Sequence, residues 1–139
     1  MMEHRTKIRV RYAETDAQGI VHHSVYPVWF EEGRSDFLRK VGVAYSQWET
    51  QGYFVVVVDL TSRYAKPAYY EDQLTVVTCL KRFKKRLMEF SYSIVDETGT
   101  KIAHGTTRHL IMDKEGRTSA LSSDFYQQIQ LKMAESAEQ

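Results

Sequence analysis

The sequence predicts an α+β domain in which an antiparallel sheet packs on one long helix. Residues 24–41 carry apolar side chains at spacings of three and four, which is the pattern of an amphipathic helix. From residue 53 onward the chain reads as consecutive strands joined mostly by tight turns. This order of elements is typical of α+β proteins. A sheet that curves around the helix is the simplest way to cover most of its sides.

Composition and charge narrow the class of protein. The chain has 139 residues, which fits a single domain over 1–139, and 42% of them are apolar, enough for a real core. The net charge is +1, so no long-range field attracts the protein to nucleic acid or acidic lipid. Cys79 is the only cysteine. This excludes an internal disulfide and, within one chain, a cysteine-based zinc site.

Neither a signal peptide nor a membrane span is expected. Residues 1–7 are polar and contain no apolar signal core. The longest apolar run, residues 54–58, is far too short to cross a membrane. We therefore expect a cytoplasmic protein that neither inserts into membranes nor binds nucleic acid.

The first strand is expected over residues 7–13, where apolar and basic side chains alternate. A polar loop follows. The long helix then begins near Ser24, a good N-cap residue, and ends at Gly42. Pro27 fits because it falls in the first turn of this helix. Gly33 interrupts the apolar stripe at a cost of about 1 kcal/mol relative to alanine, which indicates a close approach of the sheet.

The second half of the chain supplies the sheet. The strand over residues 53–60 is nearly all apolar and rich in valine, so we expect it to be buried on both faces. One face of the last strand has only small side chains, which would complement Gly33 by letting the helix lie close. Those small residues are Ala103, Gly105 and Thr107. The remaining expected elements are a short helix at 45–51, strands at 73–83, 87–96 and 101–112, and a C-terminal helix at 124–133.

The loop before the long helix carries one carboxylate and two imidazoles, Asp16, His22 and His23. With the helix N-terminus they form a suitable site for attack on a carbonyl, because free N–H groups and the helix dipole stabilise a developing oxyanion. The alternatives are a turn-forming or capping aspartate and capping or core histidines. A metal site made of the three residues is disfavoured, because adjacent histidines at a helix entry rarely face one ion.

The residue pattern of this loop and helix resembles a known family. The pattern Tyr-x-x-Thr-Asp-x-x-Gly-x-Val-x-His-x-x-Tyr, followed by Glu-x-x-Arg-x-x-Phe-Leu, runs over residues 12–38. It resembles the hotdog-fold acyl-CoA thioesterases, in particular the group of 4-hydroxybenzoyl-CoA thioesterases and Tol-Pal-associated acyl-CoA thioesterases. The resemblance implies the hotdog fold, in which an antiparallel sheet of about five to six strands wraps around one long central helix.

The resemblance also implies roles for individual residues. The catalytic carboxylate of the family corresponds to Asp16, with Tyr12 and His23 as its companions. The thioester carbonyl would be polarised by backbone N–H groups around His23 and Ser24. Asp16 would act as nucleophile or as base for water, and the residues alone do not choose. The aromatic-substrate enzyme has tyrosine where this chain has His23, which favours a short-chain or general acyl-CoA substrate.

A dense basic run covers residues 81–86. Within it, Lys84, Lys85 and Arg86 are candidates for binding the phosphates of coenzyme A. The alternative is the solvated end of a hairpin. RNA binding would need aromatic platforms beside the charges, and only Phe83 lies among them.

The expected function is hydrolysis of a fatty or aromatic acyl-CoA to the free acid and coenzyme A, with no cofactor beyond the coenzyme A of the substrate. The resemblance implies a homodimer or homotetramer with the site between subunits. One alternative is a non-catalytic module that binds acyl-CoA or acyl carrier protein, since a fold does not fix a function. Such a module would not need Asp16. The pattern of a dehydratase or hydratase is not found.

Overall fold

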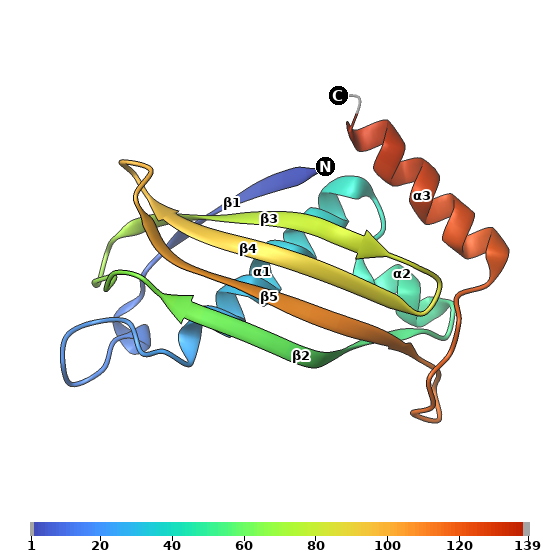
Figure 1. Cartoon of the computed structure of the whole chain (residues 1–139), viewed down its shortest axis with the longest axis horizontal. Helices are drawn as coiled ribbons and strands as arrows, with labels where there is room; N and C mark the ends of the chain where they lie inside the picture. The colour runs from blue at the N-terminus through green and yellow to red at the C-terminus, as the bar shows by residue number, and fades with distance from the viewer. Residues whose placement is uncertain (1, 138–139) are drawn as a thin grey trace.

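The computed structural model describes residues 2–137 and contains a five-stranded antiparallel sheet in the order β1-β3-β4-β5-β2. The sheet curves around the long helix α1 (Figure 1). This arrangement confirms the predicted α+β class. The strands are β1 (Glu3–Arg9), β2 (Phe54–Tyr64), β3 (Gln73–Phe83), β4 (Leu87–Asp96) and β5 (Lys101–Met112). The helices are the 3-10 turn η1 (Tyr12–Glu14), α1 (Val25–Val41), α2 (Tyr45–Thr50) and α3 (Ser123–Ala137).

The first strand ends earlier than the alternating pattern predicted. β1 stops at Arg9, and after Val10 the chain turns into η1. The N–H group of Arg11 donates to the Glu14 carboxylate at 2.8 Å instead of to a neighbouring strand. Alternation along the sequence cannot reveal such a competing acceptor three residues ahead. As a result Tyr12 leaves the sheet and is 75% exposed.

Two glycines allow α1 to lie close to the sheet. A Cβ atom on Gly33 would lie 2.5 Å from the Thr78 Oγ1 atom and 2.8 Å from the Val76 Cγ1 atom, so no larger residue fits without movement. A Cβ atom on Gly105 would collide with the carbonyl of Thr61 and the ring of Phe30. The close approach predicted from Gly33 is therefore present. Its partner is β3, whereas the small face of β5 receives the Phe30 ring.

The core lies between α1 and the concave face of the sheet. Phe30 stacks on Tyr92 with 4.5 Å between ring centroids, and Phe37 meets Phe90 edge-on at 5.9 Å. All four of these side chains are buried. Because α1 packs mainly against β1 and β3, at one side of the sheet, the two edge strands receive different amounts of cover.

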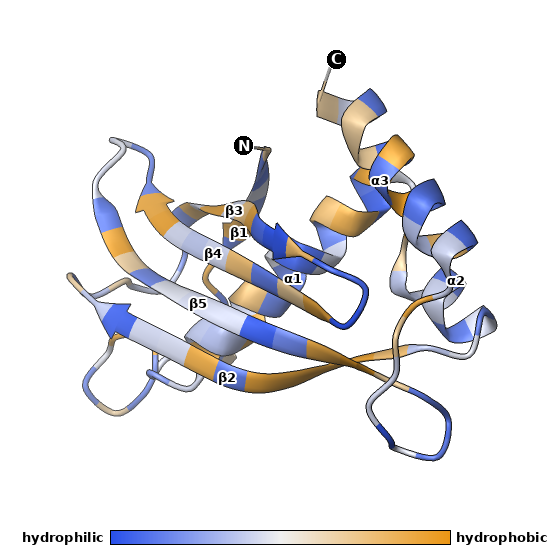
Figure 2. Ribbon diagram, turned by 45° about the vertical axis from the view of Figure 1, so that its right-hand side comes forward, coloured by the Kyte–Doolittle hydropathy of each residue, from blue (hydrophilic) through white to orange (hydrophobic). Residues whose placement is uncertain are grey.

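The prediction that the valine-rich strand is buried on both faces is wrong. β2 is an edge strand that pairs only with β5, and its side chains are exposed along most of its length. Val57 is 41% exposed, Val58 48% and Leu60 40%. Figure 2 shows hydrophobic residues along this open edge. An apolar run indicates that a strand will be covered, but not whether its own chain provides the cover.

The C-terminal helix α3 lies beside α2 at one end of the sheet (Figure 1). Its buried residues Phe125 and Ile129 join the core, and Phe125 meets Trp48 edge-on at 5.6 Å. The Lys132 ammonium donates to the carbonyl of Gly42 at 3.2 Å. None of the helices within residues 2–137 is long and apolar enough to span a membrane.

Candidate active site

A buried glutamate links the polar loop to α1 by hydrogen bonds. Glu14 is 7% exposed. Its carboxylate accepts a hydrogen bond from the indole Nε1 of Trp29 at 3.1 Å, in addition to the bond from Arg11. Its carbonyl accepts the N–H of His22 at 2.9 Å. The loop therefore has a defined position relative to the helix start. Reasoning from the sequence missed this residue, because no local pattern links Glu14 to Trp29.

Asp16 occupies a tight turn that orients its carboxylate. The N–H of Gly19 donates to the Asp16 carbonyl at 2.9 Å, and Gly19 has a φ of 81°, which glycine adopts without strain. The Asp16 Oδ1 atom accepts the N–H of Gln18 at 2.9 Å. No donor to the Oδ2 atom is found within residues 2–137. One carboxylate oxygen is thus held in place while the other is available to react.

Asp16 and His23 line the same cavity, which has a volume of about 420 Å³. The walls come from the loop, from the first turn of α1 and from the segment that follows β2. The lining residues are Asp16, Gln18, Ile20, Val21, His23, Tyr26, Tyr64, Ala65, Lys66 and Pro67. A larger hollow of about 620 Å³ lies over β1 and β3 and contains none of the predicted site residues. The chemistry of the lining, and not the size, makes the Asp16 cavity the candidate site.

The start of α1 presents a backbone donor beside this cavity. Within residues 2–137 no acceptor is found for the N–H of His23, whereas the carbonyl of His23 accepts the Tyr64 hydroxyl at 3.2 Å. The Ser24 N–H donates to the His22 Nδ1 atom at 3.2 Å. Because Nδ1 is therefore an acceptor, the Ser24 hydroxyl also donates to it, at 2.8 Å. Ser24 stands at the N-cap position as predicted, but its side chain does not cap the helix.

Two tyrosines form an aromatic wall of the cavity. The rings of Tyr26 and Tyr64 lie 5.0 Å apart. Burial, with a smaller contribution from Tyr64, raises the pKa of Tyr26 to about 12. Tyr26 is therefore a neutral hydroxyl at physiological pH. Tyr64 comes from the end of β2. No local sequence pattern links it to the loop, because the two are far apart along the chain.

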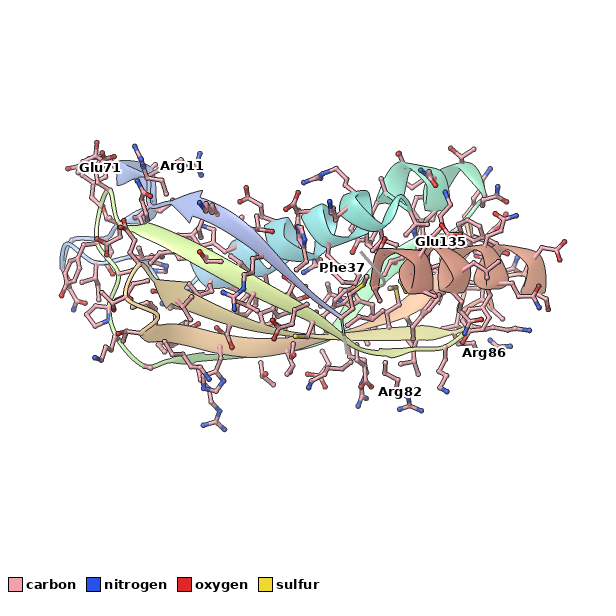
Figure 3. All side chains as sticks on the ribbon, turned by 90° about the horizontal axis from the view of Figure 1, so that it is seen from above. Arg11, Phe37, Glu71, Arg82, Arg86 and Glu135 are labelled. Carbon is pink, nitrogen blue, oxygen red and sulfur yellow. The ribbon has the colours of Figure 1, made fainter. Side chains whose placement is uncertain are left out.

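Besides Ser24, two groups of predicted site residues are not part of the lining of this cavity. Tyr12 is not part of its lining and packs edge-on against Tyr70 with 5.6 Å between centroids. The basic run lies at the β3–β4 hairpin, where the Lys85 ammonium donates to the Ser123 hydroxyl at 2.9 Å. Figure 3 shows Arg86 at the end of the molecule opposite Arg11. A single chain therefore does not bring Lys84, Lys85 or Arg86 near Asp16.

The described part of the chain, residues 2–137, contains no group of three histidine, cysteine, aspartate or glutamate side chains placed to hold a metal ion. Within these residues the site consists of a carboxylate with one hydrogen-bonded oxygen, a histidine, a backbone N–H without an acceptor at the helix start, and an aromatic wall. This arrangement can attack a polarised carbonyl and stabilise the oxyanion that forms.

A family model and two relatives indicate the same family for this chain. Residues 10–129 match the model of the thioesterase-like superfamily. The chain is 36% identical to YneP of Bacillus subtilis, named as an acyl-CoA thioesterase, over 80% of both chains. It is 29% identical to the acyl-CoA thioester hydrolase YbgC of Escherichia coli, over 69% of this chain and 72% of YbgC.

A solved structure supports the same conclusion at the level of the fold. The DHNA-CoA thioesterase of Staphylococcus aureus superposes with a TM-score of 0.89 at 28% identity, covering 96% of this chain and 92% of that one. The hotdog fold implied by the sequence pattern is confirmed. From the family model, the relatives and the fold together, the chain belongs to the thioesterase-like superfamily of thioester hydrolases.

Proposed function

We propose that the protein is an acyl-CoA thioesterase in which Asp16 is the reacting carboxylate and the N–H of His23 binds the carbonyl oxygen. The observation that carries this proposal is the pairing of the two groups in one cavity. One oxygen of Asp16 is fixed by Gln18, and within residues 2–137 neither a donor to the other oxygen nor an acceptor for the His23 N–H is found. The membership in a superfamily of thioester hydrolases agrees with this chemistry.

The reaction follows from these positions. The thioester oxygen accepts the His23 N–H, and the helix dipole favours the negative charge that develops on it. Asp16 either takes a proton from an attacking water or attacks the carbonyl carbon itself. In the first route the tetrahedral intermediate collapses directly, breaking the C–S bond and releasing the acid and the thiol of coenzyme A. In the second, the C–O bond of a mixed anhydride forms between Asp16 and the acyl group as the C–S bond breaks and the thiolate of coenzyme A leaves. Water then hydrolyses the anhydride, which releases the acid and regenerates the Asp16 carboxylate.

The acyl chain is assigned only by class. The Asp16 cavity has apolar and aromatic walls from Ile20, Val21 and Tyr26, which suit a fatty or aromatic acyl group. The names of the relatives include both acyl-CoA and DHNA-CoA enzymes, and each name applies to that relative. We therefore place both fatty and aromatic acyl-CoA thioesters in the substrate class.

A second copy of the chain completes the site in this proposal. The apolar edge of β2 is open, and an exposed edge of this kind invites another strand. Antiparallel pairing of β2 with β2 of a second copy would set the Tyr64 end of one strand against the Phe54 end of the other. The basic hairpin lies at the Phe54 end of the sheet. It would then lie at the same end as the partner's Asp16 loop, within reach of an extended coenzyme A.

Release of free thiol from a panel of acyl-CoA thioesters tests the proposal. The panel covers short, long and aromatic acyl groups. Asp16→Asn should lower kcat by about 10²-fold or more, because it removes the nucleophile or base while keeping the shape of the side chain. Asp124→Asn is the matched control, because Asp124 is exposed on α3, and it should leave kcat unchanged.

Near wild-type turnover in the Asp16 variant would overturn the assignment of Asp16. If the wild-type protein binds the thioesters without hydrolysing any of them, the non-catalytic binding module is the correct interpretation.

A further inference from the structure

A second cavity lies between α1, α2 and the start of β2, at the opposite end of β2 from the Asp16 loop. Its volume is about 350 Å³. Arg34 lines it from α1, aromatic walls come from α2 and from the segment entering β2, and two glutamates belong to its lining. The lining includes Arg34, Tyr45, Trp48, Tyr53, Glu31 and Glu49. We call this space the Arg34 cavity.

Arg34 is a buried cation that forms no ion pair among the described residues. The residue is 7% exposed, and its Nε atom has no hydrogen-bond partner in the described stretch, residues 2–137. The guanidinium interacts with the hydroxyls of Tyr45 and Tyr92, which are neutral groups. None of the ion pairs found within residues 2–137 includes Arg34. Burying a charge is costly unless the charge is paired and fully hydrogen-bonded. Arg34 meets neither condition among the described residues, so a ligand that supplied the missing partner would be favoured.

The groups around the guanidinium do not neutralise it. Burial raises the pKa of Tyr45 and of Tyr92, so both hydroxyls keep their protons. Behind them, Tyr92 bonds to Thr107, and Thr107 bonds to His109 at 2.8 Å. Burial, together with the charge of Arg34, lowers the pKa of His109 to about 4, so this imidazole is neutral. These three neighbours carry no negative charge, and the carboxylates of the lining, Glu31 and Glu49, form no ion pair with Arg34 in the part of the chain that the structure describes.

We propose that the Arg34 cavity is a binding site for a small carboxylate, which pairs with the guanidinium of Arg34. A carboxylate is planar and accepts two parallel N–H bonds from a guanidinium, including the unused one at Nε. Aromatic side chains of Tyr45 and Tyr53 suit an apolar body of the ligand. The site goes beyond the proposed hydrolysis, since nothing in it requires Asp16.

The two glutamates define the ligand further. Glu31 and Glu49 are exposed residues of the same lining. They disfavour a dianion such as phosphate, and they favour a ligand whose other end is an ammonium group. The preferred ligand is therefore a zwitterion such as an aromatic amino acid. A simple aromatic acid binds several-fold more weakly, because exposed charges contribute little each.

Binding to the whole protein, followed by NMR chemical-shift changes, tests this site. The probes are phenylalanine, 3-phenylpropanoate and their uncharged carboxamides. We expect both carboxylates to bind at least ten-fold more tightly than their amides. Arg34→Met should lose at least ten-fold in affinity for the carboxylates, whereas Arg5→Met, the same change on the exposed face of β1, should lose none.

A second variant keeps the test valid if Arg34→Met fails to fold. The double change Glu31→Gln and Glu49→Gln alters only exposed side chains, and it should strengthen binding of 3-phenylpropanoate several-fold while removing the preference for phenylalanine. Equal affinity for acids and amides would overturn the proposal. So would the absence of binding of either acid at about 10 mM, because a ligand that binds more weakly than about 1 mM is still detected at that concentration.

Inhibition of acyl-CoA hydrolysis identifies the source of the carboxylate. Competitive inhibition by 3-phenylpropanoate means that the cavity receives part of the substrate or product, whereas binding without competition means a separate ligand. Asp16→Asn should leave binding at Arg34 unchanged. Failure of the carboxylate site and failure of the proposed hydrolysis are therefore distinguishable.

Discussion

The two edges of the sheet differ in how they meet solvent. On β1 the exposed positions alternate and are all charged, as Glu3, Arg5, Lys7 and Arg9. The other face of β1 is tied to α1, where the carboxylate of Asp36 binds His4 at 2.7 Å and Thr6 at 2.8 Å. On β2 the exposed side chains are mainly valine, leucine and tyrosine. Charged edges resist pairing with another strand, and apolar edges promote it. One edge therefore ends the sheet, and the other is suited to continue it.

The largest expected effect comes from placing a charge on the apolar edge. Val57→Lys should abolish the proposed dimer, because the added ammonium would be buried without a partner at the interface. Activity that depends on the second copy should fall with it, by about 10²-fold in kcat/KM, since misplaced substrate contacts cost this much. Light scattering coupled to gel filtration measures the mass, and thiol release measures the activity.

Val28→Lys is the matched control, because Val28 is 56% exposed on α1 and away from β2. It should change neither mass nor rate. If the Val57→Lys protein keeps the mass and activity of the wild type, the proposal that two copies pair through β2 is wrong.

Acid should weaken the β2 side of the sheet through His109, the β5 residue paired with Val57. Its pKa in the fold is about 4, below the ordinary value of 6.5, because of burial and the charge of Arg34. Between these two values the unfolded chain binds a proton that the folded chain does not. Stability should therefore fall by about 2–3 kcal/mol as the pH falls from about 6.5 to about 4.

Urea unfolding at pH 7 and at pH 4.5 measures this loss. His109→Leu should reduce the difference between the two pH values, whereas His104→Leu, on the other face of β5, should keep the wild-type difference. Equal pH dependence in all three proteins would show that His109 does not control it.

The smallest expected effect concerns the basic hairpin, which reaches a second copy only if β2 is the pairing edge. The double change Lys84→Glu and Lys85→Glu should raise KM for an acyl-CoA about ten-fold and leave KM for a phosphate-free thioester unchanged, because only coenzyme A carries the phosphates. Lys114→Glu, an exposed turn position, is the control. An equal rise for both substrates would mean that the hairpin acts on folding or assembly and not on phosphate.

Much of the fold could be predicted because its elements are local patterns. The 3.6-residue period of α1 and the alternation along β3, β4 and β5 each depend on residues within one segment. The hotdog fold and the enzyme class followed from a pattern confined to residues 12–38. Burial of β2 could not be predicted in the same way, because it depends on where α1 lies under the sheet. The cytoplasmic location and the absence of a cofactor stay predictions.

The residues of the candidate site that are close in sequence could be predicted, and those that act through contacts far along the chain could not. Asp16 and His23 are close in sequence, and the structure places both on one cavity. Tyr64 and Glu14 were missed, since each acts through a contact with a residue far along the chain. Tyr12 was predicted as a site residue from its place in the motif. It lies in η1, is largely exposed and is not part of the cavity lining, and its role stays a prediction. A motif identifies which residues matter together and leaves their directions undetermined.

The bond between Glu14 and Trp29 has a spectroscopic consequence. The chain has two tryptophans, one in α1 and one in α2. Trp29 donates its indole N–H to the loop beside Asp16, while Trp48 is buried between Phe83 and Phe125 near α3. Indole emission depends on the charge and polarity next to the ring. With Trp48 replaced by phenylalanine, tryptophan emission excited selectively over the tyrosines would come from Trp29 alone, beside the Asp16 loop, so ligand arrival there could be timed without an attached dye.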